Sequence, residues 1–323
     1  MKAIVQDGEK LLLGESDTPK FGKDEIVVKT AATAINRADL LQKRGLYPPP
    51  AGASTILGLE AAGVVEQVGE EVVGWKIGDR VCALLAGGGY AEYFVTPAEL
   101  AMPIPEHFSF EEAAAIPEAF LTVQLSLVKL GGLTSNQTVL IHAGASGIGT
   151  AAIQMVREMG STAVVTVGSE RKQLFCLSLG AELTINYREE DFEKKIAEFT
   201  EGKGVNIILD PVGAPYWQQN INSLAMDGRL VLIATMGGAK LEAVDLRKIL
   251  SRRLQVIGTT LRARSREEKS LLTREFIDFA LECFNDGRLV PVIDNVWNWR
   301  DVEEAHRYME QNSNIGKLVL KVD

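Results

Sequence analysis

The pattern of apolar and polar positions changes about a third of the way along the chain. Up to about residue 120, short β-like runs such as 2–6 and 25–30 alternate with glycine and proline, which is typical of a mainly β domain. Residues 45–52 include three consecutive prolines, which remove backbone donors and favour extended geometry. We therefore expect an ordered loop there.

From about residue 121 to 261, apolar runs alternate with helix-like stretches such as 149–159 and 171–179. This alternation predicts parallel strands joined by crossover helices, and six strands make a complete doubly wound sheet. The expected strands are 139–142, 163–167, 183–185, 207–209, 229–233 and 254–259. The fold class is therefore α/β, with a Rossmann-type parallel sheet beside a β-rich domain.

The remaining residues predict a helix to about 284, a strand at 291–297, a helix at 301–310 and a strand at 317–322. We expect this tail to pack back onto the first domain. A chain of 323 residues is too long for one typical core. The expected domains are 1–121, 122–262 and 263–323, with the last completing the first.

Composition excludes several function classes. With 46% apolar and 24% charged residues, the chain is globular, and a net charge of −9 disfavours nucleic acid. The short basic pairs Arg252–Arg253 and Arg262 with Arg264 predict solvated faces or anion contacts. Three dispersed cysteines offer neither a disulfide framework nor a metal knuckle, which fits a reducing cytosol. We expect a cytoplasmic protein without a membrane partner, since no targeting or spanning segment is present.

A glycine turn follows the strand at 139–142 and opens a helix. It keeps the first and last glycines of G-x-G-x-x-G, a loop whose backbone N–H groups cradle a pyrophosphate. The alternative is a merely tight turn between strand and helix. The expected phosphate-binding residues are Gly144, Ser146, Gly147, Ile148 and Gly149.

The end of the next strand bears on the choice of cofactor. Gly168 lies where an NAD site would place an acid for the ribose hydroxyls. Ser169, Arg171 and Lys172 supply a hydroxyl and two cations suited to a 2′-phosphate. NADPH is therefore favoured over NADH, although Glu170 could hold ribose hydroxyls instead of pointing to solvent.

Several motifs carry a resemblance to a known family: they lie at 36–39, 57–63, 78–80, 114–120, 144–149 and 314–317. Together they resemble the zinc-free quinone oxidoreductase branch of the medium-chain dehydrogenase/reductase superfamily. The chain is most similar to its tumour-suppressor-inducible quinone oxidoreductase subgroup. The resemblance implies a GroES-like catalytic domain, a Rossmann domain, a nicotinamide in the cleft between them, and a homodimer through residues 254–261.

The resemblance also assigns further cofactor-binding residues. Thr122 would lie near the nicotinamide, Tyr187 near the adenosine phosphate, and the others along the cofactor. The full set is Thr122, Tyr187, Gly213, Met236, Gly237, Leu261 and Lys317. Gly213 and Gly237 have an alternative as plain strand-end turns.

Zinc-dependent members of the superfamily bind the metal with cysteine and histidine. Here the region where the first zinc-binding cysteine would lie is Ile35–Arg37, which contains no cysteine. Leu59 replaces the histidine of the Gly-His-Glu motif. We therefore expect no metal. The three histidines are far apart in sequence, and each predicts a core or surface role: they are His107, His142 and His306.

Without a Lewis acid, hydride transfer favours acceptors that delocalise charge, namely quinones and α,β-unsaturated carbonyls. Candidate catalytic donors to the developing oxyanion are Tyr47 and Asn36. Tyr47 could instead stack on a quinone or be an exposed loop aromatic, and Asn36 could serve only its turn. Asp39 is expected to hold Arg37 or cap the next helix, and Glu60 to pair with a nearby arginine.

The leading hypothesis is an NADPH-dependent, zinc-independent quinone or enone reductase. A 2-enoyl thioester reductase, with Tyr47 as proton donor, is the alternative within enzymes. A low-turnover NADPH-binding or sensor protein is the alternative outside them.

Overall fold

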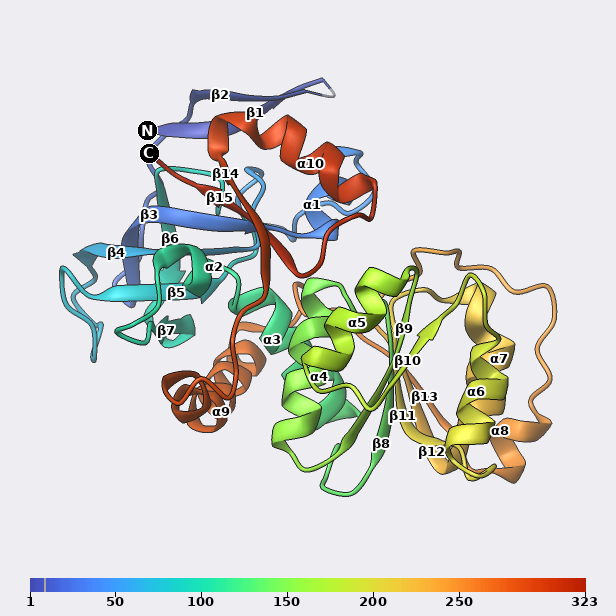
Figure 1. Cartoon of the computed structure of the whole chain (residues 1–323). Helices are drawn as coiled ribbons and strands as arrows, with labels where there is room; N and C mark the ends of the chain where they lie inside the picture. The colour runs from blue at the N-terminus through green and yellow to red at the C-terminus, as the bar shows by residue number, and fades with distance from the viewer. Residues whose placement is uncertain (9) are drawn as a thin grey trace. The chain divides into compact units, whose positions relative to one another are not determined.

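The computed structural model describes residues 1–8 and 10–323, which form two compact units (Figure 1). Unit 1 contains Met1–Leu121 and Arg262–Asp323, and unit 2 contains Thr122–Leu261. The chain therefore enters unit 2 once and leaves it once. The chain returns to unit 1 at Arg262, one residue earlier than the expected return at residue 263.

Unit 1 is built on a mostly antiparallel sheet. Its described strands are β1 Lys2–Asp7, β2 Lys10–Glu15, β3 Glu25–Ile35, β4 Glu60–Val68, β5 Arg80–Leu84, β6 Tyr93–Pro97, β7 Ala101–Pro103, β14 Ile293–Asn298 and β15 Lys317–Lys321. They pair in the order β14-β15-β3-β4-β5-β7, with β6 also paired to β3, while β1 and β2 pair with each other. Leu318 of β15 lies opposite Ile35 of β3, so the end of the chain completes the N-terminal sheet.

Unit 1 also carries helices at the sheet's margins: α1 Arg37–Lys43, α2 Phe110–Ala114, α3 Pro117–Val123, α9 Arg266–Asn285 and α10 Val302–Glu310. The last two residues of α3 belong to unit 2. The long helix expected after residue 262 begins only at Arg266, because Ser265 caps it and forms a capping box with Glu268. Tyr90 and Trp299 are the largest side chains of one core cluster in this unit.

Unit 2 contains a six-stranded parallel sheet. Its strands are β8 Thr138–His142, β9 Thr162–Val167, β10 Leu183–Asn186, β11 Val205–Asp210, β12 Leu224–Leu232 and β13 Gln255–Gly258. The strand order is β10-β9-β8-β11-β12-β13, which is the doubly wound order of a dinucleotide-binding domain. The predicted fold class is confirmed. The order reverses between β8 and β11, and ligands bind at such a point beyond the carboxyl ends of the strands.

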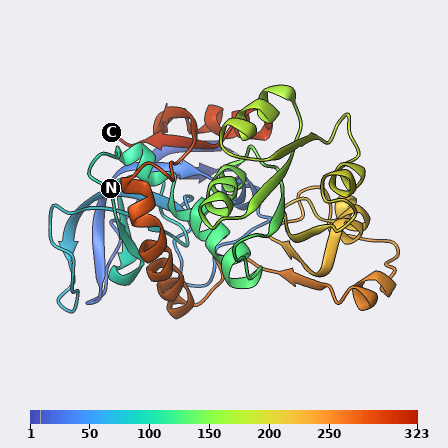
Figure 2. The same cartoon turned by 60° about the horizontal axis from the view of Figure 1, so that its bottom comes forward.

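Helices cover both faces of this sheet (Figure 1 and Figure 2). They are α4 Gly147–Glu158, α5 Glu170–Ser178, α6 Phe192–Phe199, α7 Trp217–Ser223 and α8 Arg247–Ser251. A π-helix at Gln124–Leu130 continues α3 into unit 2. The expected start of β12 at residue 229 was wrong. The strand begins at Leu224, and a bulge lies before Arg229, where Asp227 and Gly228 resemble a turn in sequence.

Candidate functional site

The turn between β8 and α4 requires its glycines. A Cβ at Gly144 would lie 2.6 Å from Val165 Cβ, and one at Gly149 would lie 2.5 Å from the carbonyl oxygens of Ala143 and Gly144. Ser146 caps α4, its Oγ accepting from Gly149 N at 3.0 Å. The next N–H groups of the helix start have no acceptor within the helix, which suits an anion such as a pyrophosphate.

Gly168 follows β9, and a neighbouring tyrosine covers it. A Cβ at Gly168 would lie 2.7 Å from Tyr187 Oη, so no side chain fits here while the phenol keeps its place. Ser169 caps α5, its Oγ accepting from Lys172 N at 3.4 Å. Glu170 and Arg171 are exposed. The structure thus brings Ser169 and Tyr187, both expected to bind the cofactor phosphate, to one strand end.

A third strand end in unit 2 is organised by Asp210, which sequence reasoning missed. Its Oδ1 accepts from Val212 N at 2.6 Å and Gly213 N at 3.1 Å, and its Oδ2 accepts from Asn220 Nδ2 at 3.0 Å. The φ of Gly213 is 87°, in the left-handed region. The sequence signal that could have found Asp210 is an acid at the end of a strand, three residues before a glycine. An aspartate in this position accepts hydrogen bonds from the backbone of the turn that follows it.

His142 links this turn to the neighbouring strands. Its Nε2 lies 2.7 Å from Asn220 Oδ1 and its Nδ1 2.8 Å from Thr166 Oγ1. Burial lowers the pKa of His142 to about 4, so the ring is neutral at physiological pH. The core role expected for His142 is confirmed, because its buried ring joins Thr166 of β9 to Asn220 of α7, whose amide also binds Asp210 at the end of β11.

The remaining cofactor candidates in unit 2 lie in different environments. Met236 N donates to Pro211 O at 3.0 Å and Gly237 N to Val212 O at 2.9 Å, which places both beside Gly213. Met236 is 53% exposed, whereas Thr122 and Leu261 are buried at the two points where the chain crosses between units.

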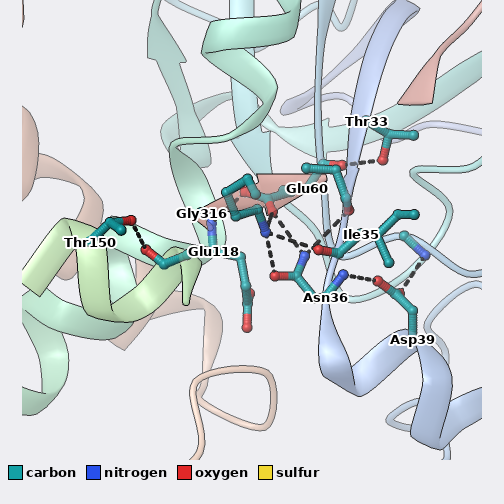
Figure 3. A network of polar contacts seen from close by, with 12 residues as sticks. Thr33, Ile35, Asn36, Asp39, Glu60, Glu118, Thr150 and Gly316 are labelled. Atoms are coloured by element: carbon teal, nitrogen blue, oxygen red, sulfur yellow. Dashed lines mark hydrogen bonds and ion pairs between the residues drawn. The ribbon is translucent and has the colours of Figure 1, made fainter. Parts of the chain in front are cut away.

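In unit 1 the motifs at 36–39, 57–63 and 314–317 meet in one buried network (Figure 3). Lys317 Nζ donates to Glu60 Oε1 at 2.6 Å, to Asn36 Oδ1 at 2.6 Å and to Ile35 O at 3.2 Å. Asn36 Nδ2 donates to Glu60 Oε1 at 2.8 Å and weakly to Ala34 O at 3.4 Å. The expectation that an arginine partners Glu60 was wrong: the cation is Lys317.

This arrangement uses the hydrogen-bonding groups of two residues expected in the site. All three hydrogens of the Lys317 ammonium have acceptors inside unit 1, and Lys317 is 5% exposed. These bonds hold the ammonium beside Glu60, and cofactor binding by Lys317 stays a prediction. Both hydrogens of the Asn36 amide also have acceptors. We assign both residues to orienting Glu60.

Asp39 caps α1 rather than holding Arg37. Its Oδ2 accepts from Asn36 N at 2.7 Å and its Oδ1 from Gly58 N at 3.0 Å. Burial raises the pKa of Asp39 to about 6 despite these bonds. Tyr90 Oη lies 3.4 Å from Asp39 Oδ2 and 3.1 Å from His306 Nε2, which extends the chain of polar contacts to α10.

Tyr47 packs against Arg262, whose guanidinium carbon lies 5.3 Å from the ring centre. Arg262 donates to Ala86 O at 2.6 and 2.9 Å and to Gln42 Oε1 at 2.7 Å, and is 4% exposed. The expectation of a solvated Arg262 was wrong, because a buried guanidinium needs these acceptors. Tyr47 is consequently part of an organised loop and is not a free surface aromatic.

The glycines at 87–89 lie against the chain's own backbone. A Cβ at Gly87 would lie 2.5 Å from Ser54 O, and Gly88 N donates to Ile56 O at 2.8 Å.

Within the described residues, no three His, Cys, Asp or Glu side chains are grouped to hold a metal ion. No helix of the described chain has the length and apolar character needed to cross a bilayer.

Comparison with known proteins agrees with this architecture. The sequence model of the alcohol dehydrogenase GroES-like domain matches residues 22–106, and that of the zinc-binding dehydrogenase matches 147–278. Quinone oxidoreductase 1 of Escherichia coli (strain K12) is 34% identical over 97% of this chain and 96% of its own length. The synaptic vesicle membrane protein VAT-1 homolog of Danio rerio is 29% identical over 94% of this chain. This chain spans 66% of that relative's length, and 14% of a polyketide synthase subunit of Mycobacterium tuberculosis.

Solved structures give the same picture. An NAD-dependent alcohol dehydrogenase superposes with a TM-score of 0.87 at 30% identity, covering 100% of both chains. An Escherichia coli quinone oxidoreductase complexed with NADPH superposes with a TM-score of 0.85 at 30% sequence identity, covering 99% of this chain and 98% of that one. The CurK enoyl reductase superposes with a TM-score of 0.86 at 28% sequence identity, covering 100% of this chain and 98% of that one. The chain belongs to the medium-chain dehydrogenase/reductase superfamily, among its zinc-free, quinone oxidoreductase-like members.

Proposed function

We propose that this protein is an NADPH-dependent, zinc-independent reductase that transfers hydride to quinones or other conjugated carbonyl compounds. The observation that carries the choice of cofactor is the covered Gly168. An NAD-type acid at this position would have to displace the phenol of Tyr187, whose hydroxyl lies 2.7 Å from the place of the first side-chain atom. Tyr187 and Ser169 offer hydroxyl groups beside this strand end, and Arg171 and Lys172 add positive charge.

The residues of unit 2 fit a dinucleotide. Gly144 and Gly149 leave a cradle that a Cβ would fill, and Ser146 starts the helix whose backbone N–H groups would bind the pyrophosphate. We propose Gly144, Ser146, Gly147, Ile148 and Gly149 as its binding residues, with Gly213, Met236 and Gly237 along the rest of the cofactor. When bound, the nicotinamide would supply a hydride.

Unit 1 supplies the polar groups that favour a conjugated acceptor. The carboxylate of Glu60 is paired with the ammonium of Lys317, so this carboxylate has a counter-charge within unit 1. Tyr47 has a hydroxyl to stabilise an oxyanion and a ring to stack on a flat acceptor. We therefore keep Tyr47 as a catalytic donor and give Asn36 the role of orienting Glu60.

A side-by-side assay tests the reaction. NADPH oxidation is measured with 1,2-naphthoquinone, 1,4-benzoquinone and a crotonyl thioester. We expect the quinones to be reduced; oxidation with the thioester alone would select the enoyl reductase, an alternative supported by the likeness to the CurK enzyme. Binding of NADPH without oxidation by any acceptor would favour a sensor.

The cofactor assignment has its own test. Replacing Ser169 and Lys172 with alanine removes a hydroxyl and a cation from the proposed 2′-phosphate site. We expect the KM for NADPH to rise about tenfold or more, since each charge-assisted hydrogen bond contributes roughly 1.5–3 kcal/mol. The KM for NADH, which has no 2′-phosphate, is the control. Equal changes for the two cofactors would contradict the assignment.

A further inference from the structure

Glu118 is the one ionisable residue of the 114–120 motif, and the proposed function gives it no role. It lies in the first turn of α3, and its backbone N donates to Glu60 Oε2 at 2.8 Å. The side chain extends away from the Glu60–Lys317 pair (Figure 3). Its Oε2 atom is enclosed and has no hydrogen-bond partner among the described residues, although the residue as a whole keeps some exposure.

Charged and titratable groups face this carboxyl from several elements. Glu60 of β4 and Asp39 of α1 oppose its ionisation, whereas Lys317 of β15 and Arg262 favour it. Tyr47 and Lys269 of α9 also lie within electrostatic reach. Burial, followed by the charge of Glu60, raises the pKa of Glu118 to about 8. A neutral carboxylic acid has an O–H to donate, whereas a carboxylate only accepts.

The backbone holds Glu118 in this position. Because its N–H is bonded to Glu60 Oε2, the start of α3 is attached to the pair that Lys317 and Asn36 orient. The backbone of Glu118 is therefore fixed within unit 1. The enclosed Oε2 atom of its carboxyl has no hydrogen-bond partner among the described residues. An enclosed carboxyl oxygen without a hydrogen-bond partner costs stability, and a titratable group in such a place is a candidate functional residue.

We propose that Glu118 is a catalytic residue that donates the proton required to complete reduction of the acceptor. This inference rests on the proposed function. A bound nicotinamide would supply the hydride with its two electrons and be oxidised in turn, which would leave a negative charge on the acceptor oxygen. The O–H bond of Glu118 then breaks as a new O–H bond forms on the acceptor oxygen. The carboxylate regains its proton from water, so one proton is consumed in each turnover.

The test uses Glu118→Gln, which keeps size and polarity but has no proton to transfer. Its matched control is Glu111→Gln, on the neighbouring helix α2, where the carboxylate forms a surface ion pair with Lys321. The first measurement needs no turnover. Infrared spectra recorded between pH 7 and 10, above the pKa of Asp39, should contain a carboxylic acid band that disappears around pH 8 in the wild type and in Glu111→Gln. This band should be absent in Glu118→Gln.

The second measurement is the pH profile of kcat with 1,4-benzoquinone, alongside the Kd for NADPH. In the wild type kcat should fall above about pH 8, as the donor loses its proton. In Glu118→Gln kcat should be lower by about 10²-fold or more and lose this alkaline limb. The Kd for NADPH should stay within twofold, and Glu111→Gln should match the wild type.

The outcomes separate the two proposals. An active wild type with a Glu118→Gln variant of equal kcat and unchanged pH profile overturns the role of Glu118 alone. Absence of the titrating infrared band also overturns it. A wild type that reduces no acceptor overturns the proposed function and this inference with it, whatever the infrared titration shows.

Discussion

At the scale of single residues, two glycines of unit 2 differ in what an added methyl group would meet. At Gly149 the Cβ would lie 2.5 Å from two backbone carbonyl oxygens, which cannot move without breaking the turn. At Gly168 it would meet the hydroxyl of Tyr187, the far end of a side chain that is 44% exposed. The same substitution therefore tests backbone packing at one position and side-chain placement at the other.

We expect Gly149→Ala to lower the free energy of unfolding by about 1–3 kcal/mol, the usual result of overpacking, and to abolish dinucleotide binding. Gly168→Ala should leave stability nearly unchanged but weaken NADPH binding by displacing Tyr187. Urea denaturation and NADPH fluorescence titration measure the two effects. Tyr187→Phe, which keeps the ring and removes the hydroxyl, should leave stability unchanged and weaken NADPH binding only by the contribution of that hydroxyl. Equal destabilisation in both glycine variants would contradict this distinction.

At the scale of elements, the periodicity of apolar residues predicted those helices, strands and turns whose formation depends on residues close together in sequence. The strands of unit 2 and the turn at Gly144–Gly149 follow from apolar runs and glycine spacing, and apart from the early start of β12 they lie within one or two residues of their expected bounds. Partners from distant segments left no such signal. Lys317 and Glu60 are 257 residues apart, and Arg262 reaches Ala86 across 176 residues. Only the folded sheet brings these pairs together, so a buried arginine looked like a surface one.

Arg262 joins three segments of unit 1, and its loss should loosen them. In Arg262→Gln the shorter amide cannot reach all of Ala86 O, Gln42 Oε1 and the Tyr47 ring, which leaves buried acceptors without donors. We expect the free energy of unfolding to fall by about 2–4 kcal/mol and the KM for quinone to rise. Denaturation and steady-state kinetics measure these effects.

Arg264→Gln is the matched control for Arg262→Gln. Arg264 lies two residues away and forms an i,i+4 ion pair with Glu268 on a partly exposed surface. Such a pair contributes about 0.2–0.5 kcal/mol, so its removal should be nearly neutral. If the two arginine variants lost similar stability, the guanidinium of Arg262 would not be the link between the three segments.

At the scale of the whole molecule, each unit carries a buried titratable group, and the two act in opposite directions. Burial lowers the pKa of His142 in unit 2 to about 4, below its ordinary 6.5. The folded state then binds fewer protons than the unfolded state, so His142 removes stability as pH falls from 6.5 towards 4. Burial raises the pKa of Glu118 in unit 1 from 4.5 to about 8. Glu118 therefore removes stability as pH rises from 4.5 towards 8.

Single substitutions should tilt the pH dependence of stability in opposite senses. Relative to the wild type, His142→Gln should gain stability as pH falls from 6.5 to 4.5, and Glu118→Gln should gain it as pH rises from 5 to 8. Each slope is at most about 1.4 kcal/mol per pH unit, the limit for one proton. Urea midpoints across this range measure both slopes, with exposed His107→Gln as the control. Parallel curves for all variants would mean that neither buried group changes protonation on folding.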